Sequence, residues 1–167
     1  PILLTKSEWL TQVTATEIQR LQATKIIILG GTGAVSQEAE DALIAMGLEV
    51  ERINGANRFE TAALIAARVA PAGSAQAALV NGLDFPDALS VAAYAARLGM
   101  PVLMTRPDVM PDATVQALEA LGVTETIVIG GTSVVSDEVM AAAPGAIRIC
   151  GSNRYATSVA IAEFFMP

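Results

Sequence analysis

Short, uninterrupted hydrophobic runs alternate along this chain with longer stretches in which hydrophobic positions recur at helical spacing. In the first part, the runs lie near 2–4, 26–29 and 49–53, and the helical stretches near 14–22, 37–46 and 58–70. In the second part, the runs lie at 77–80, 102–104, 126–129 and 146–149, and the helical stretches near 87–98, 113–121, 136–143 and from 155 onward. Continuous hydrophobic strands are typical of a sheet covered on both faces, and their alternation with helices predicts right-handed crossovers. The pattern therefore predicts an α/β fold with parallel sheets flanked by helices.

One structural unit occurs twice. Pro1-Ile2-Leu3-Leu4-Thr5 recurs as Pro101-Val102-Leu103-Met104-Thr105, and Gly30-Gly31-Thr32 recurs as Gly130-Gly131-Thr132, both at an offset of 100. The block 52–59 recurs as 148–155 at an offset of 96. The first copy lacks a counterpart of residues 75–100, and Pro71-Ala72-Gly73-Ser74 has the composition of a linker. We therefore predict a truncated first repeat unit, 1–71, and a complete second repeat unit, 72–167.

Composition narrows the classes of function. The formal net charge is −7, from 17 acidic and 10 basic side chains, which argues against nucleic acid as a partner. No uninterrupted hydrophobic stretch reaches the roughly 20 residues of a membrane helix, so no membrane partner is expected. The chain has no histidine and a single cysteine, Cys150, which removes the commonest general base and metal ligand and any internal disulfide. We expect no cofactor and no metal.

The repeated blocks, together with Asn81-Gly82-Leu83-Asp84-Phe85-Pro86-Asp87-Ala88-Leu89-Ser90, resemble the type 2 cell-wall-binding repeat of surface proteins from Gram-positive bacteria. The matching blocks run through nearly the whole chain in the family's order, and three of the four occur twice. The resemblance implies a Rossmann-like or Toprim-like three-layer fold built from tandem repeats. It further implies repeats that occur in threes or as a trimeric assembly, and that tether their protein to an anionic secondary polymer of the wall. The expected location is extracellular, at the cell wall or cell surface.

Two arginines are the principal candidates for ligand contact. Arg58 and Arg154 lie in the first turn of predicted helices, where a cation faces the positive end of the helix dipole, so a compensating group is expected. That group is either an internal carboxylate, Asp84 or Asp87, or an external anion such as a polymer phosphate or uronate. Arginine suits bidentate pairing with either kind.

Asn57 and Asn153 precede the same two helices, and a capping role is favoured over ligand contact because Asn is among the preferred helix caps. Asn57 and Glu60 also have the spacing of a capping box. The run Ile2-Leu3-Leu4 is most simply a buried strand, while the resemblance implies that it takes part in polymer binding.

The segment Gly30-Gly31-Thr32-Gly33-Ala34-Val35-Ser36 follows a predicted strand and opens a helix, which is where phosphate-binding loops lie. The spacing Gly-x-Gly-x-x-Gly is not met, and Ser133 replaces Gly33 in the second copy. A tight turn with Ser36 and Ser136 as helix caps is the favoured interpretation. A nucleotide-binding domain of an enzyme is the alternative.

Asp84 and Asp87 predict the start of a helix, since Pro86 is tolerated in the opening turn and carboxylates are favoured by the dipole. General acid–base catalysis needs convergent partners that the sequence does not identify, so the protein is not expected to be an enzyme.

Ligands of open α/β sheets bind beyond the carboxyl ends of the strands, where three repeated turns, 30–33, 54–58 and 81–87, are expected to converge. Together with this expectation, the family resemblance implies a non-catalytic module that anchors a surface protein to an anionic cell-wall polymer. Its candidate contacts are Arg58, Arg154, Asn57, Asn153, Ile2, Leu3, Leu4, Gly30, Gly31, Asp84 and Asp87. A structural packing module, in which the arginines pair internally, is a further alternative.

Overall fold

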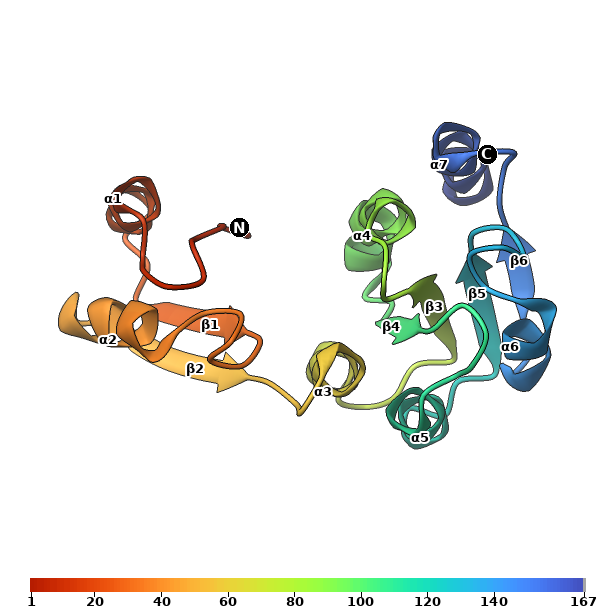
Figure 1. Cartoon of the computed structure of the whole chain (residues 1–167), viewed down its shortest axis with the longest axis horizontal. Helices are drawn as coiled ribbons and strands as arrows, with labels where there is room; N and C mark the ends of the chain where they lie inside the picture. Colours follow the sequence, from red (N-terminus) through yellow and green to blue (C-terminus); the bar gives the residue numbers. More distant parts are fainter. Residues whose placement is uncertain (167) are drawn as a thin grey trace. The chain divides into compact units, whose positions relative to one another are not determined.

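The computed structural model describes residues 1–166. The chain divides into two compact units, Pro1–Asn57 (unit 1) and Arg58–Pro167 (unit 2) (Figure 1). Unit 1 contains α1 (Gln12–Arg20), β1 (Lys25–Leu29), α2 (Gln37–Ala45) and β2 (Glu49–Ile53). Unit 2 contains α3 (Arg58–Val69), β3 (Gln76–Asn81), α4 (Pro86–Leu98), β4 (Val102–Thr105), α5 (Asp112–Ala120), β5 (Glu125–Ile129), α6 (Asp137–Ala142), β6 (Ile147–Ile149) and α7 (Arg154–Phe165).

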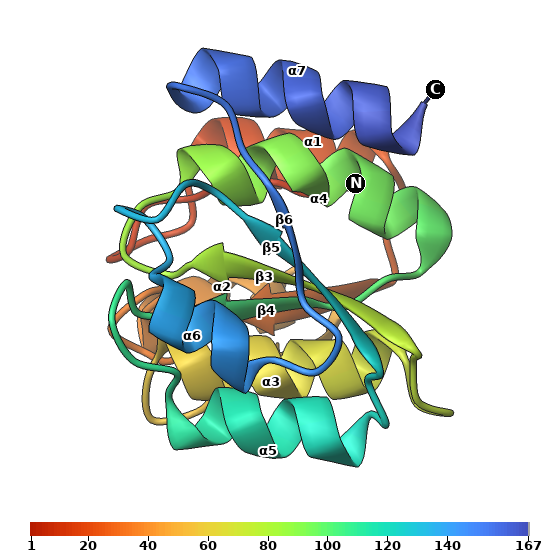
Figure 2. The ribbon, with the colours of Figure 1, turned by 90° about the vertical axis from the view of Figure 1, so that its right-hand side faces the viewer.

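Unit 2 is a three-layer α/β structure. Its four strands are all parallel and lie in the order β4-β3-β5-β6. Side chains of α4 and α7 pack on one face of the sheet, and those of α3, α5 and α6 on the other (Figure 2). The central strand β3 is buried on both faces, since Ala77, Ala78, Leu79 and Val80 are fully enclosed. The predicted fold class, parallel sheets flanked by helices, is confirmed.

Unit 1 is smaller. Strands β1 and β2 are parallel, and α1 and α2 contribute Ile18 and Leu43 to a core around Ile28 of β1. The predicted helix near 14–22 begins earlier, because the side chain of Thr11 accepts a hydrogen bond from the amide of Thr14 and so caps α1.

The strand predicted at 2–4 is wrong, because these residues form no strand in unit 1. The equivalent strand of unit 2, β4, is hydrogen-bonded to a single neighbour, β3. Unit 1 contains no strand corresponding to β3 among its described residues. The segment 2–4 therefore lacks the backbone partner that a strand requires.

The compact units do not divide where the sequence repeats divide. The repeats were predicted to meet between residues 71 and 72, whereas the units meet between Asn57 and Arg58. The difference is α3, which ends the first repeat in sequence but packs against β4 and α5 of unit 2. Hydrophobic periodicity shows which face of a helix is buried but not which sheet covers it. The repeat assignment, 1–71 and 72–167, stays a prediction about the sequence.

Candidate functional site

The candidate site lies in unit 2 where β3 and β5 end. These strands are neighbours, yet the chain leaves β3 for α4 on one face of the sheet and leaves β5 for α6 on the other face (Figure 2). In open α/β sheets, ligands bind at such a divergence, at the carboxyl ends of two adjacent strands. The loops bordering it are residues 82–85 after β3 and 130–136 after β5.

The loop after β3 is shaped by its own side chains. Asn81 Oδ1 accepts a hydrogen bond from the amide of Leu83 at 2.9 Å, and Asp84 Oδ1 accepts one from the amide of Phe85 at 3.0 Å. Helix α4 then begins at Pro86, as the sequence predicted. These contacts fix the backbone that presents Asp84 and Asp87.

Asp87, in the first turn of α4, is buried, with 9% of its surface exposed. Its environment raises the pKa of the carboxyl above its ordinary value. Burial is the main cause, the charge of Asp84 adds to it, and the charge of Arg154 opposes it. A Cβ added to Gly130 would lie 2.7 Å from Asp87 Oδ2, so the backbone of the β5 loop passes directly over this carboxylate. Glycine is required there for space as well as for its φ of 111°.

Arg154, at the start of α7, lies beside Asp84. The distance from Arg154 Nη2 to Asp84 Oδ2 is 3.5 Å, and the two side chains are 55% and 53% exposed. An internal carboxylate therefore compensates this arginine, but the pair is open to solvent. Exposed pairs of this kind contribute only about 0–1 kcal/mol, so separating Arg154 from Asp84 costs little.

Arg58, at the start of α3, reaches the same loop. Its Nη1 donates a hydrogen bond to the carbonyl oxygen of Gly82 at 2.6 Å. The predicted compensation by Asp84 or Asp87 is not found for Arg58, because a backbone carbonyl takes that place. The structure nevertheless brings the two predicted arginines, Asp84 and Asp87 together around one loop, which we call the strand-tip cluster: Arg58, Asp84, Asp87 and Arg154.

The predicted capping role of Asn153 is confirmed. Its Oδ1 accepts hydrogen bonds from the amides of Tyr155 and Ala156, both at 3.0 Å, at the beginning of α7. Asn57 ends unit 1 and immediately precedes α3. Contact of either asparagine with a ligand stays a prediction.

The glycine loops are closed turns in both units. Ser36 and Ser136 cap α2 and α6 by accepting hydrogen bonds from the amides of Ala39 and Val139 at 3.2 and 3.3 Å. The favoured interpretation, a tight turn with a serine cap, is confirmed. Gly30 has a φ of 110°, and Gly31 follows it in the turn.

The sequence did not identify two further arginines, which stabilise these turns by hydrogen bonds to their carbonyl oxygens. Arg52 Nη1 donates to the carbonyl oxygens of Gly30 and Val35 at 2.8 and 3.0 Å, and Arg148 Nη1 donates to those of Gly130 and Val135 at 2.8 Å each. Each arginine also pairs with an acid of the helix that follows the glycine turn: Arg52 with Glu40 of α2, and Arg148 with Asp137 of α6. Their recurrence at the same place in both repeats was the available signal. Carbonyl groups of the loops are thus held by the protein itself.

The hydrophobic candidates Ile2, Leu3 and Leu4 lie in unit 1 and are 89%, 38% and 86% exposed. The expectation that they form a buried strand is therefore wrong for unit 1. Their aliphatic side chains form an exposed apolar surface and carry no charged group that could pair with an anion.

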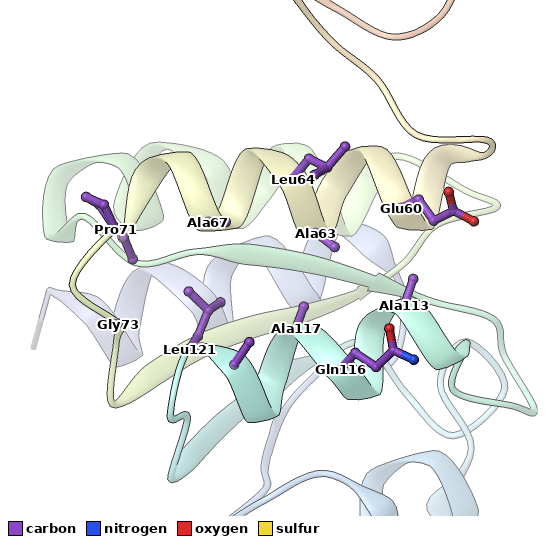
Figure 3. Close-up of a pocket in the computed structure, with 12 residues that line it drawn as sticks. Glu60, Ala63, Leu64, Ala67, Pro71, Gly73, Ala113, Gln116, Ala117 and Leu121 are labelled. Atoms are coloured by element: carbon purple, nitrogen blue, oxygen red, sulfur yellow. The ribbon is translucent and has the colours of Figure 1, made fainter.

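A hollow lies elsewhere in unit 2, between α3 and α5. It encloses about 430 Å³ and is lined mostly by alanine and leucine, with Glu60 and Gln116 at one end (Figure 3). No predicted site residue lines it. Its small apolar side chains offer shape but no convergent polar groups, which a specific ligand site normally contains.

Residues 1–166 contain no helix long and apolar enough to cross a membrane. Across the same part of the chain, no group of three or more His, Cys, Asp or Glu side chains is placed to hold a metal ion.

Residues 52–140, just over half of the chain, match the family Cell wall binding domain 2 (CWB2). The chain is 36% identical to N-acetylmuramoyl-L-alanine amidase LytC of Bacillus subtilis over 98% of its own length, and 35% identical to the amidase enhancer of Bacillus subtilis over 93%. It spans only 32% and 21% of those two proteins. Among solved structures, Cwp6 from Clostridium difficile superposes with a TM-score of 0.91 at 28% identity, covering all of this chain and 28% of that one. Cwp8 from Clostridium difficile superposes with a TM-score of 0.81 at 32% identity, covering 96% of this chain and 28% of that one.

Proposed function

Since the chain belongs to the Cell wall binding domain 2 family and is therefore a cell-wall-binding domain, we propose that it binds an anionic secondary polymer of the wall and performs no catalysis itself. In this proposal the chain holds its parent protein non-covalently at the surface of a Gram-positive bacterium. The amidase relative is about three times as long as the segment that this chain matches. We assign wall attachment to the matched segment and leave catalysis to the remainder of such proteins.

The observation that carries the proposal is the strand-tip cluster. Two guanidinium groups reach one loop at the carboxyl end of β3, and the side chain of Arg154 is more than half exposed. A phosphate or uronate oxygen that replaced Asp84 would accept charge-assisted hydrogen bonds from Arg154. The protein as a whole is acidic, with a net charge of −7, so attraction to a polyanion depends on such local groups rather than on overall charge.

The carboxylates of the cluster support binding better than catalysis. Asp84 is engaged by Arg154 and by the amide of Phe85, and Asp87 lies under the backbone of Gly130. A general acid or base must reach the reacting atom and needs a matched partner. Neither carboxylate has both properties.

Single contacts of this kind are weak, so repetition is part of the proposal. Linked weak sites gain about 10²–10⁴ in avidity without any new contact. We expect the intact module to contain further repeats of the same kind, three in one chain or in a trimeric assembly.

A role in packing repeats against one another is favoured by one observation. Helix α3, from the first repeat in sequence, docks on unit 2 by burying Phe59, and the guanidinium carbon of Arg106 lies 5.2 Å from the centre of that ring. Such docking is compatible with wall binding, because it leaves Arg154 exposed.

The arginine assignment is tested by sedimentation with purified cell walls. Each arginine that forms charge-assisted hydrogen bonds to the polymer contributes about 1.5–3 kcal/mol, so Arg58→Ala or Arg154→Ala should weaken binding by about 10- to 100-fold. The double variant should lose binding at micromolar protein. The matched control is Arg20→Ala with Arg97→Ala, which removes two exposed positive charges from the last turns of α1 and α4; Arg97 lies at the opposite end of α4 from Asp87.

The control variant should sediment like the parent protein. Equal sedimentation of all three proteins would refute the arginine assignment. An equal loss of wall binding in both double variants would show a general effect of positive charge rather than specific contacts of Arg58 and Arg154.

A further inference from the structure

A further arginine, Arg106, directly follows β4, which is the neighbour of β3 on the side away from β5. The other copy of the repeat carries a cation at the same place, Lys6, at the offset of 100 that relates the two copies. The buried hydroxyl of Thr105 donates hydrogen bonds to the carbonyl oxygens of Arg106 and Val109 at 3.0 and 3.2 Å. The amide of Arg106 donates to the same oxygen of Val109 at 3.2 Å. The backbone of Arg106 is therefore fixed without use of its guanidinium group.

An aromatic ring positions that guanidinium group. The Cζ atom of Arg106 lies 5.2 Å from the centre of the Phe59 ring, and Phe59 is only 6% exposed. Within residues 1–166, no carboxylate forms an ion pair with Arg106, although the exposed Asp108 lies two residues further on. A cation–π contact orients the plane of a guanidinium group while leaving its N–H donors available to a ligand. Arg106 is thus an exposed cation that is already held in place.

Arg58 is anchored at the same contact. Its Nη1 donates a hydrogen bond to the carbonyl oxygen of Gly82 at 2.6 Å, and this partner is uncharged. A Cβ added to Gly82 would lie 2.9 Å from Cε1 of Phe59, so the Phe59 ring packs directly on Gly82. The ring therefore links the residue that Arg58 binds to the guanidinium group of Arg106. Two positive charges held around one buried ring favour the approach of an anion.

We propose that Arg58 and Arg106 form an oxyanion subsite at the ends of β3 and β4, and that it takes a phosphate or carboxylate group of the wall polymer. A guanidinium group that is stacked on a ring presents its donor edge to either kind of oxyanion. This inference rests on the proposed function, because it assigns unit 2 a second contact with the same polymer.

The subsite differs in one respect from the contact at Arg154. An anion that binds Arg154 must first separate it from Asp84, whereas no carboxylate is paired with Arg106. The side chain of Arg106 is also positioned before the ligand arrives, which lowers the entropic cost of binding. Arg106 therefore contributes more to polymer affinity than Arg154 does.

The first test is calorimetric titration of the full chain with purified wall polymer. Arg106→Gln removes the charge from an exposed side chain and should weaken binding by about 10- to 100-fold. Arg106→Lys keeps the charge but loses the planar donor edge, so its affinity should lie between those of Arg106→Gln and the parent protein. The matched control is Arg97→Gln, an exposed cation in the last turn of α4, which should bind like the parent protein.

A further variant separates ligand contact from a role in folding. Phe59→Leu removes the ring but keeps an apolar side chain, and it should also weaken binding because Arg106 loses its support. Adding Arg106→Gln to Phe59→Leu should weaken binding by less than Arg106→Gln does alone, since the ring acts through Arg106. Urea unfolding shows that each variant is folded. Fully independent effects of the two substitutions would contradict positioning of Arg106 by Phe59.

The second test does not need the polymer. The side-chain Nε–H resonance of Arg106 is followed by NMR during titration with sodium phosphate or sodium glucuronate, with sodium chloride at equal ionic strength as the control. The resonance should shift saturably with at least one of the two oxyanions, which identifies the preferred acidic group, and should stay in place with chloride.

The inference and the proposed function fail in different ways. Equal polymer affinity of Arg106→Gln and the parent protein would overturn the subsite and leave polymer binding intact. An Arg106 resonance that neither oxyanion shifts would also overturn it. A parent protein that does not bind the polymer would refute the proposed function, and with it the polymer as the ligand of Arg106, even if phosphate shifts the resonance.

Discussion

Replacing Gly130 by alanine tests the geometry at the base of the strand-tip cluster. The residue has a φ of 111°, where non-glycine residues are strained by about 1–3 kcal/mol. Its new Cβ would lie 2.7 Å from Asp87 Oδ2 and 3.0 Å from Val134 Cγ1, and crowding of a packed site costs a further ~1–3 kcal/mol. Gly130→Ala should therefore lower the free energy of unfolding of unit 2 by about 2–6 kcal/mol.

The neighbouring glycine provides the control. No atom lies within 4 Å of a Cβ built on Gly131, so Gly131→Ala should stay within about 0.5 kcal/mol of the parent protein. The assay is urea unfolding followed by far-UV circular dichroism, with Trp9 fluorescence reporting unit 1 separately. Adding Asp87→Ala to Gly130→Ala should recover about 0.5–3 kcal/mol, since it removes the clash with Asp87 but neither the contact with Val134 nor the backbone strain. Equal stability of the two glycine variants would refute this description of the turn.

Three further predictions concern the same region. Burial raises the pKa of Asp87 in the folded state, so this group favours folding below its unfolded pKa of about 3.9 and loses that contribution as the pH rises through the folded pKa. Asp87→Asn should therefore be more stable than the parent protein at pH 7 but not at pH 3.5, as measured by thermal unfolding at the two pH values. A stability difference between variant and parent that is the same at both pH values would contradict the burial argument. Arg148→Met should destabilise unit 2 by about 1–3 kcal/mol because two loop carbonyls lose their donor, whereas Asp137→Asn, at a side chain 74% exposed, should cost at most about 1 kcal/mol in the same urea titration. Asn153→Ala should cost about 0.5–2 kcal/mol through loss of the α7 cap, and unchanged wall sedimentation of the folded variant would confine Asn153 to that role.

The layers of unit 2 could be predicted from the sequence because its hydrophobic runs have the continuity of strands buried on both faces, as in β3. The serine caps were predictable as well, since a cap is a local interaction set by residue type and position. The segment 2–4 could not be predicted correctly, because a strand needs a neighbour and the pattern of three hydrophobic residues does not reveal whether one is present.

The site was predicted less completely than the fold. The sequence identified Arg58 and Arg154 through their unfavourable place in a helix dipole, but the carbonyl of Gly82 as the partner of Arg58 depends on how α3 packs. The contributions of Arg52 and Arg148 depend on carbonyl groups turned inward by the glycine loops, which residue types alone do not show. Long-range backbone geometry, rather than side-chain chemistry, accounts for both omissions.

Isothermal titration with the purified secondary wall polymer addresses the anchoring proposal most directly. The polymer is compared with the same material after its acidic groups have been neutralised chemically, and with peptidoglycan alone. Saturable binding to the untreated polymer that weakens with added salt and disappears on neutralisation is the expected result. Equal heats for the neutralised polymer or for bare peptidoglycan would contradict recognition of negative charge by the strand-tip cluster.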